Sequence, residues 1–144
     1  MALPHALQEV IKRPGIYLYP VEFDVAAAFI QGFDVASSGG TLVGFREWLV
    51  VRLGYGNNLA WSESALRLAF PDAEFPRQCL LQSGEQKRAV ELLFGLLEEF
   101  WQEREAPHGL LRIYLRYQAW LQRQDWYGPT SPDYFADPSD PGKR

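Results

Sequence analysis

The segment from residue 83 to residue 104 constrains the fold more than any other part of the chain, because its apolar residues recur at helical spacing. On a helical wheel the following residues fill more than half of the circumference: Ala89, Val90, Leu92, Leu93, Phe94, Leu96, Leu97, Phe100, Trp101 and Arg104. At the start, Ser83 and Gln86 match a capping box, in which each side chain bonds the other residue's unpaired N–H group. We therefore expect a long central helix that is buried on most of its sides.

Proline and glycine residues divide the rest of the chain into shorter apolar segments with the same helical period. These segments predict further helices near residues 3–13, 24–36, 41–53, 58–70 and 110–124. Asp24 and Thr41 are expected as N-caps, and Gly32 suggests a close approach of two backbones. Residues 71–82 are expected to form a longer connection. Pro107 and Gly109 mark a tight turn that predicts an antiparallel hairpin of the last two helices.

The predicted fold class is all-α, a compact single-domain bundle of five to six helices over residues 1–124. Only residues 16–19 or 80–81 could form a short strand. An aromatic, proline-rich tail is expected over residues 125–144, because four of the ten prolines lie between positions 129 and 141. Trp126 and Tyr127 are expected to dock on the bundle, and Tyr134 and Phe135 to be exposed.

Composition limits the classes of function. A length of 144 residues with 47% hydrophobic residues is enough for one well-filled core. The single cysteine and the charged residues among the first fourteen positions favour the cytoplasm over secretion, and no segment could span a membrane. The net charge of −4 argues against nucleic acids and anionic membranes as partners.

Residues suited to catalysis are scarce in this sequence. Cys79, His5 and His108 show no spacing that would form a metal site or a nucleophile–base pair. The segment 54–58 resembles a phosphate loop but lacks the Lys-Ser/Thr pair and the preceding strand. We therefore expect no metal, no cofactor and no enzymatic activity.

Charged and apolar residues near the predicted hairpin are candidates for binding. Glu98, Glu99, Glu103 and Glu105 lie at the C-terminal end of the long helix, where they oppose the helix dipole. They form either a salt-bridge ladder with Arg112 on the next helix or an acidic patch for a basic partner. Leu111 and Leu115 lie behind the main apolar face of that helix, so they either pack internally or form an exposed patch.

Several short motifs resemble those of small helical bacterial proteins. Arg13–Leu18 (Arg-Pro-Gly-Ile-Tyr-Leu) resembles their Arg-Pro-x-Met-Tyr-Leu signature, with Ile16 in place of Met. Phe29–Phe33, Phe45–Leu49 and Leu92–Phe100 are similar to their Phe-Leu-x-Gly-Tyr, Phe-x-x-Trp-Leu and Leu-Phe-x-x-Leu-x-x-Phe helices. The resemblance covers roughly residues 7–101. It implies a helical protein of the kind found in toxin and immunity loci, where a small acidic protein neutralises a toxin by binding it.

Together these features predict an immunity, or antitoxin-like, protein that binds and occludes a cognate toxin domain. The expected partner-binding residues are Glu98, Glu99, Glu103, Arg112, Arg116, Trp126, Tyr127, Tyr134 and Phe135. Acidic groups would speed the encounter and aromatic groups would supply buried anchors. The alternative is a non-enzymatic adaptor or homodimeric scaffold that uses Leu111 and Leu115.

Overall fold

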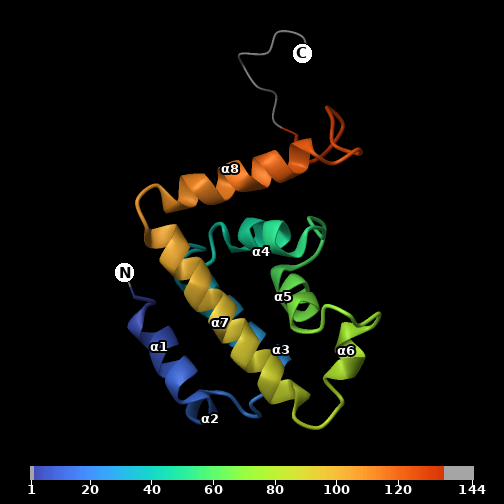
Figure 1. Cartoon of the computed structure of the whole chain (residues 1–144). Coiled ribbons are helices and arrows are strands. Elements are labelled where there is room, and N and C mark those ends of the chain that lie inside the picture. Colours follow the sequence, from blue (N-terminus) through green and yellow to red (C-terminus); the bar gives the residue numbers. More distant parts are fainter. Residues whose placement is uncertain (1, 135–144) are drawn as a thin grey trace.

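The computed structural model describes residues 2–134, and this part of the chain contains only helices and turns (Figure 1). The helices are α1 (His5–Lys12), α2 (Pro14–Tyr17), α3 (Phe23–Ala36), α4 (Phe45–Leu53), α5 (Trp61–Ala69), α6 (Pro76–Cys79), α7 (Glu85–Glu105) and α8 (Gly109–Gln122). The all-α prediction is confirmed. Eight helices replace the expected five to six over the described residues, because α2 and α6 are additional single turns.

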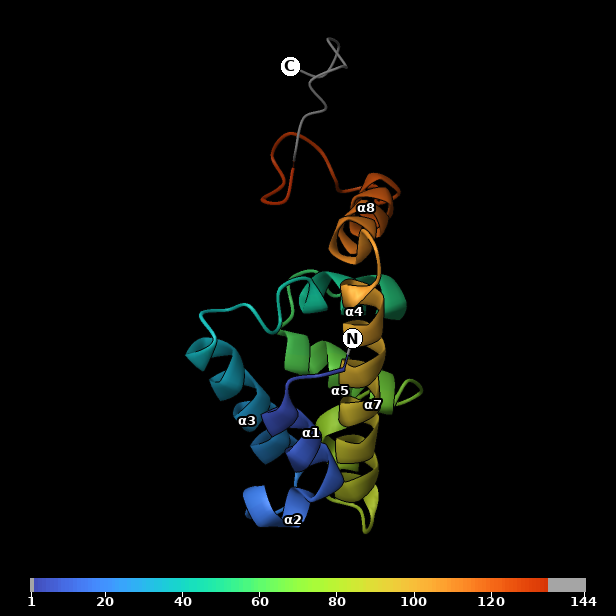
Figure 2. The same cartoon turned by 90° about the vertical axis from the view of Figure 1, so that its left-hand side faces the viewer.

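Helix α7 is the central element, as the apolar pattern predicts. It contacts α3, α4, α5 and α8, and α1 lies beside it (Figures 1 and 2). The ring of Phe100 on α7 is fully buried and packs on Phe45 of α4, with ring centroids 4.9 Å apart. Burial of such large side chains from several helices holds the bundle together.

The start of α7 differs from the capping box expected at Ser83 and Gln86. Gly84, with φ of 80°, precedes the helix, and no side chain caps it. The Oε1 atom of Gln86 instead accepts a hydrogen bond from the backbone N–H of Phe23, at 2.8 Å, in the first turn of α3. Gln86 therefore satisfies a free N–H group of a different helix, 63 residues away in sequence.

Two other predicted caps are also wrong. Helix α3 begins after Glu22, so Asp24 lies in its first turn. Helix α4 begins after Gly44 rather than Thr41, because the chain first forms a turn in which Gly44 has φ of 89°. Tertiary contacts fix that turn, since a Cβ atom on Gly44 would lie 2.8 Å from Cδ1 of Leu110.

The inner face of α3 does not include Gly32, where a close approach of two backbones is expected from the sequence. The buried residues are Phe23, Ala26, Ala27 and Ile30. Gly32 is exposed, and a Cβ atom placed on it would meet nothing within 4 Å, so the expected close approach does not occur. Helix α3 is apolar on more than one side, and its period alone does not select the face that meets α7.

Helix α8 crosses the end of α7 rather than running back along it. In Figure 2, α7 is seen from the side whereas α8 is seen nearly along its axis, and Figure 1 shows α8 lying across the top of α4. The expected antiparallel hairpin is therefore wrong. The turn is so tight that a Cβ atom on Gly109 would lie 2.1 Å from the carbonyl oxygen of Glu103. That backbone contact sends α8 sideways onto α4.

The crossing of α8 divides the apolar interior into two clusters. The large cluster is built on α7 and includes residues of α1, α3, α4 and α5 and Ile113 of α8. The small cluster consists of Val50, Tyr117, Trp120 and Leu121, with Val51 and Tyr127 against it. The second half of α8 is therefore held mainly by α4.

Candidate protein-binding surfaces

Two of the predicted partner-binding glutamates meet arginines where α4, α7 and α8 cross. Glu103 accepts hydrogen bonds from the indole Nε1 of Trp48, at 2.7 Å, and from Nη1 of Arg116, at 3.2 Å. Glu99 forms an ion pair with Arg52, whose guanidinium also lies 4.5 Å from the ring centroid of Trp48. These five residues are called the junction cluster below.

The junction cluster replaces the ladder expected between the glutamates and Arg112. Because α8 crosses α7, Arg116 is the residue of α8 that reaches Glu103. Sequence reasoning missed Trp48 and Arg52, although they are four residues apart on one helix and therefore share a face. Since Glu99 and Glu103 are each paired with an arginine, this end of α7 offers less negative charge than its sequence suggests.

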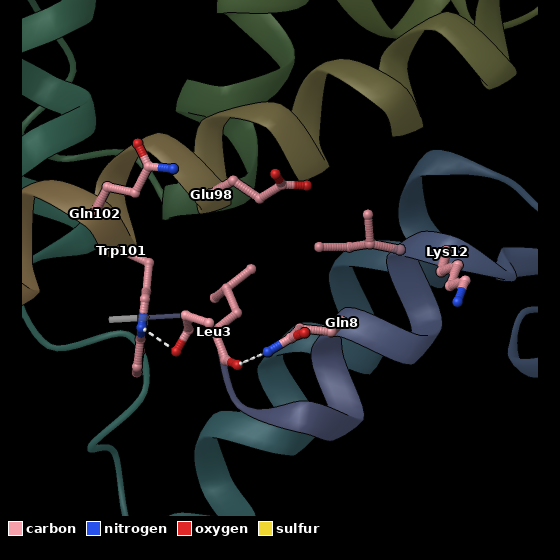
Figure 3. Close-up of a pocket in the computed structure, with 8 residues that line it drawn as sticks. Leu3, Gln8, Lys12, Glu98, Trp101 and Gln102 are labelled. Atoms are coloured by element: carbon pink, nitrogen blue, oxygen red, sulfur yellow. Dashed lines mark hydrogen bonds between the residues drawn. The ribbon is translucent and has the colours of Figure 1, made fainter.

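Glu98 lies on another side of α7, apart from the junction cluster, and faces α1 (Figure 3). It borders a groove of about 330 Å³ between the two helices. The groove is also lined by Ala2, Leu3, Gln8, Ile11, Lys12, Trp101 and Gln102. The structure thus separates Glu98 from Glu99 and Glu103 instead of gathering the three into one patch.

Helix α8 exposes two leucines on its outer side. Leu111 is 57% exposed and Leu115 is 59% exposed, and Tyr114 is half-exposed on the next stripe. Of the two alternatives for these leucines, internal packing is therefore wrong, because α8 lies on one face of the bundle and nothing within the described residues covers its other side. Arg112, Arg116 and Arg123 are exposed along one flank of the leucines.

The chain after α8 folds back as turns and is fastened by a buried tyrosine. The hydroxyl of Tyr117 donates a hydrogen bond to Oδ2 of Asp133, at 2.9 Å. Nη2 of Arg46 lies 3.7 Å from Oδ1 of Asp133, and its Nη1 donates to the backbone oxygen of Asn57 at 2.9 Å. Burial raises the pKa of Tyr117 to about 12, and the carboxylate of Asp133 acts in the same direction.

The aromatic residues of this segment are placed differently from one another. Trp126 contacts the ring of Trp120 but is 50% exposed, whereas Tyr127 is half-buried and accepts a hydrogen bond from Gln118 at 3.2 Å. Tyr134 is half-buried against Tyr127, with ring centroids 5.5 Å apart, so its expected exposure is wrong. The predicted binding residue Phe135 lies outside the described residues.

Residues suited to chemistry are not brought together in the described part of the chain. Over residues 2–134 no group of three or more His, Cys, Asp or Glu side chains could hold a metal ion. Cys79 is half-buried on α6 and packs against the large cluster, while His5 and His108 are exposed at the starts of α1 and α8. No helix in these residues is both long and apolar enough to cross a membrane.

Comparison with known proteins gives no match. No protein-family model, no curated protein and no solved structure is significantly similar to this chain.

Proposed function

We propose that this protein is a non-enzymatic binding protein of the immunity, or antitoxin-like, type, which occludes a toxin domain in the cytoplasm. The observation that carries the proposal is the outer side of α8, where Leu111 and Leu115 are more than half exposed. Neighbouring large apolar residues exposed on one helix are typical of protein-binding surfaces. Half-exposed Trp126 beyond the end of α8 adds a residue type that often anchors interfaces.

The charges on α8 favour a partner with acidic groups. Its sequence contains Arg112 and Arg116 and no acidic residue, and Arg123 follows directly. The leucines would supply the apolar centre of the contact, and Arg112 and Arg123 would pair with carboxylates at its edge, since Arg116 already pairs with Glu103. This assignment moves the expected contact from the glutamates of α7, of which Glu99 and Glu103 are already paired, to α8.

The second candidate function is a homodimeric scaffold or adaptor in which α8 meets α8 of another copy. The same exposed leucines favour it. In a two-fold interface, however, each copy presents the same patch, so the arginines of both copies would be brought near one another. We therefore place the toxin partner ahead of the homodimer.

The test compares L115E with L81E. Both leucines are exposed, but Leu81 lies far from α8 in the connection between α6 and α7, so L81E is the matched control. Both variants should keep the helical content and midpoint of unfolding of the wild type. Tagged wild-type protein and L81E should retain one polypeptide from the source organism's lysate, and L115E should not.

The retained polypeptide is then expressed alone in a host cell. The proposal requires that it stops growth, that co-expressed wild-type protein and L81E restore growth, and that L115E does not. Analytical ultracentrifugation distinguishes the toxin partner from the homodimeric scaffold. The scaffold function would be established instead if the wild type is a dimer, L115E is a monomer and no toxic partner is retained.

A further inference from the structure

The groove between α1 and α7 combines apolar walls with a charged edge. Its walls are the side chains of Leu3, Ile11 and Trp101, and the indole Nε1 of Trp101 donates a hydrogen bond to the backbone oxygen of Ala2 at 3.0 Å. That bond and the burial of Leu3 fix the N-terminal segment against α7. The groove is therefore a formed feature rather than a gap between mobile side chains.

Glu98 differs from the other glutamates of α7 in its partners. Glu85, Glu91, Glu99, Glu103 and Glu105 each form an ion pair, with Arg88, Lys87, Arg52, Arg116 and Arg104 respectively. Within residues 2–134, Glu98 has no ion pair or side-chain hydrogen bond. Figure 3 shows its side chain lying along α7 at the edge of the groove, while the ammonium group of Lys12 points away. Both carboxylate oxygens of Glu98 are open to a ligand.

We propose that this groove binds an arginine side chain of a partner polypeptide. The methylene stem would lie along Leu3, Ile11 and Trp101, because long basic side chains bury their stems on apolar surfaces. The guanidinium would meet the carboxylate of Glu98 through two parallel hydrogen bonds. Arginine fits better than lysine because its planar fork matches both free oxygens.

The size of the groove and the carboxylate of Glu98 favour a single cationic side chain. A volume of about 330 Å³ is at the lower end of the range of about 300–1,000 Å³ for small-molecule sites, so it suits one side chain rather than a nucleotide. A phosphate would face the carboxylate of Glu98. The groove lies on α1 and α7, whereas the surface proposed above is on α8, so either proposal can fail without the other.

The experiment titrates the full chain with a blocked arginine, N-acetyl-arginine N-methylamide, and follows amide and indole signals by ¹H–¹⁵N NMR. We expect saturable shifts of the Trp101 indole and of Gln8 and Glu98 amides. The uncharged analogue with citrulline in place of arginine should shift these signals far less. Absence of saturable shifts at the groove, or equal binding of the citrulline analogue, would overturn the proposal.

Two variants test whether the carboxylate of Glu98 binds the guanidinium group. E98Q removes the carboxylate and keeps the shape, and it should weaken binding of the blocked arginine about threefold to fivefold, as expected for an exposed charged pair. E91Q, on the same helix but away from the groove, should leave binding unchanged. Equal weakening in both variants would show a general charge effect and contradict a site at Glu98.

A variant of Lys12, the other charged residue of the groove, should change binding of the blocked arginine in the opposite direction to E98Q. K12M removes a positive charge that repels the ligand and should tighten binding. If Glu98 instead serves only to pair with Lys12 in solution, K12M would lower stability and leave the groove unable to bind the blocked arginine, which would refute the proposal.

Discussion

Tyr117 links the C-terminal segment to the bundle through a single hydroxyl group. Its oxygen donates to Asp133 and accepts from Nη1 of Arg46, at 3.5 Å, so one phenol connects α4, α8 and the turns after α8. A buried hydroxyl with a charged acceptor contributes more than an ordinary hydrogen bond. The segment up to Tyr134 is therefore part of the folded unit.

The raised pKa of Tyr117 gives a pH-dependent stability. Its pKa is about 12 in the folded chain and its ordinary value is 10.0, so the folded state holds the phenolic proton more tightly. The stability that the protonated Tyr117 adds to the folded state is complete below pH 10 and is lost as the pH rises toward 12. Ultraviolet difference titration of wild type against Y117F should show one tyrosine ionising near pH 12.

D133A serves as the companion variant for that titration. Loss of the carboxylate removes one of the groups that raise the pKa of Tyr117, so its ionisation should move toward pH 10. The contrary result is that the tyrosine removed by Y117F ionises in the wild type near its ordinary pKa of 10.0. That result would show that the hydrogen bond to Asp133 does not persist in solution.

Among the elements, the connection between α7 and α8 determines where α8 lies. Gly109 has no Cβ atom, which lets the backbones of the two helices approach as closely as they do. The sequence signals the turn through Pro107 and Gly109, but the direction of the next helix depends on this contact. Loop composition predicts a turn and does not predict its angle.

Gly109→Ala should destabilise the protein by at least about 2 kcal/mol, because the added methyl group would overlap the carbonyl oxygens of Glu103 and Arg104. The matched control is Gly95→Ala in the middle of α7, where a Cβ atom meets nothing within 4 Å. That change should stabilise the protein by about 0.5–1 kcal/mol. Urea unfolding followed by circular dichroism measures both; equal midpoints for the two variants would contradict the close contact.

Helix positions could be predicted from the sequence, but most caps and faces could not. Apolar periodicity over residues 83–104 reflects burial inside the bundle, so it identifies α7 directly. A cap depends on which group is nearest in space, and Gln86 bonds to Phe23 of another helix instead of its own. The same holds for the junction cluster. Glu99 and Glu103 could be recognised in the sequence as candidate binding residues, whereas their partners Arg52 and Arg116 could not, because those pairs depend on how three helices cross.

Across the whole molecule, Arg104 joins the large cluster to the loop before α4. Its side chain is 7% exposed, stacks 4.0 Å from the ring centroid of Trp101, and donates to the backbone oxygens of Gly40 and Thr41. The small cluster of Val50, Tyr117, Trp120 and Leu121 lies between α4 and α8 and, within residues 2–134, includes no residue of α7. The two clusters should therefore differ in how readily they open.

Native-state hydrogen exchange should show this difference. Amides of residues 117–121 should exchange through a local opening whose free energy is lower, by on the order of 1–3 kcal/mol, than that for residues 93–100 of α7. Trp120→Ala should lower protection of α8 and leave that of α7 close to the wild-type value. Identical protection of both regions would mean that the molecule opens only as one unit.

The division into two clusters also affects how related sequences can diverge. Substitutions on the outer side of α8 touch neither cluster, so they carry little cost in folding and can accumulate freely. Helix α7 is contacted from several sides, and a change there must be matched by its neighbours. We expect homologous chains to keep the residues of α7 while varying Leu111, Leu115 and the residues around them, so that the surface proposed for partner binding can change on an unchanged scaffold.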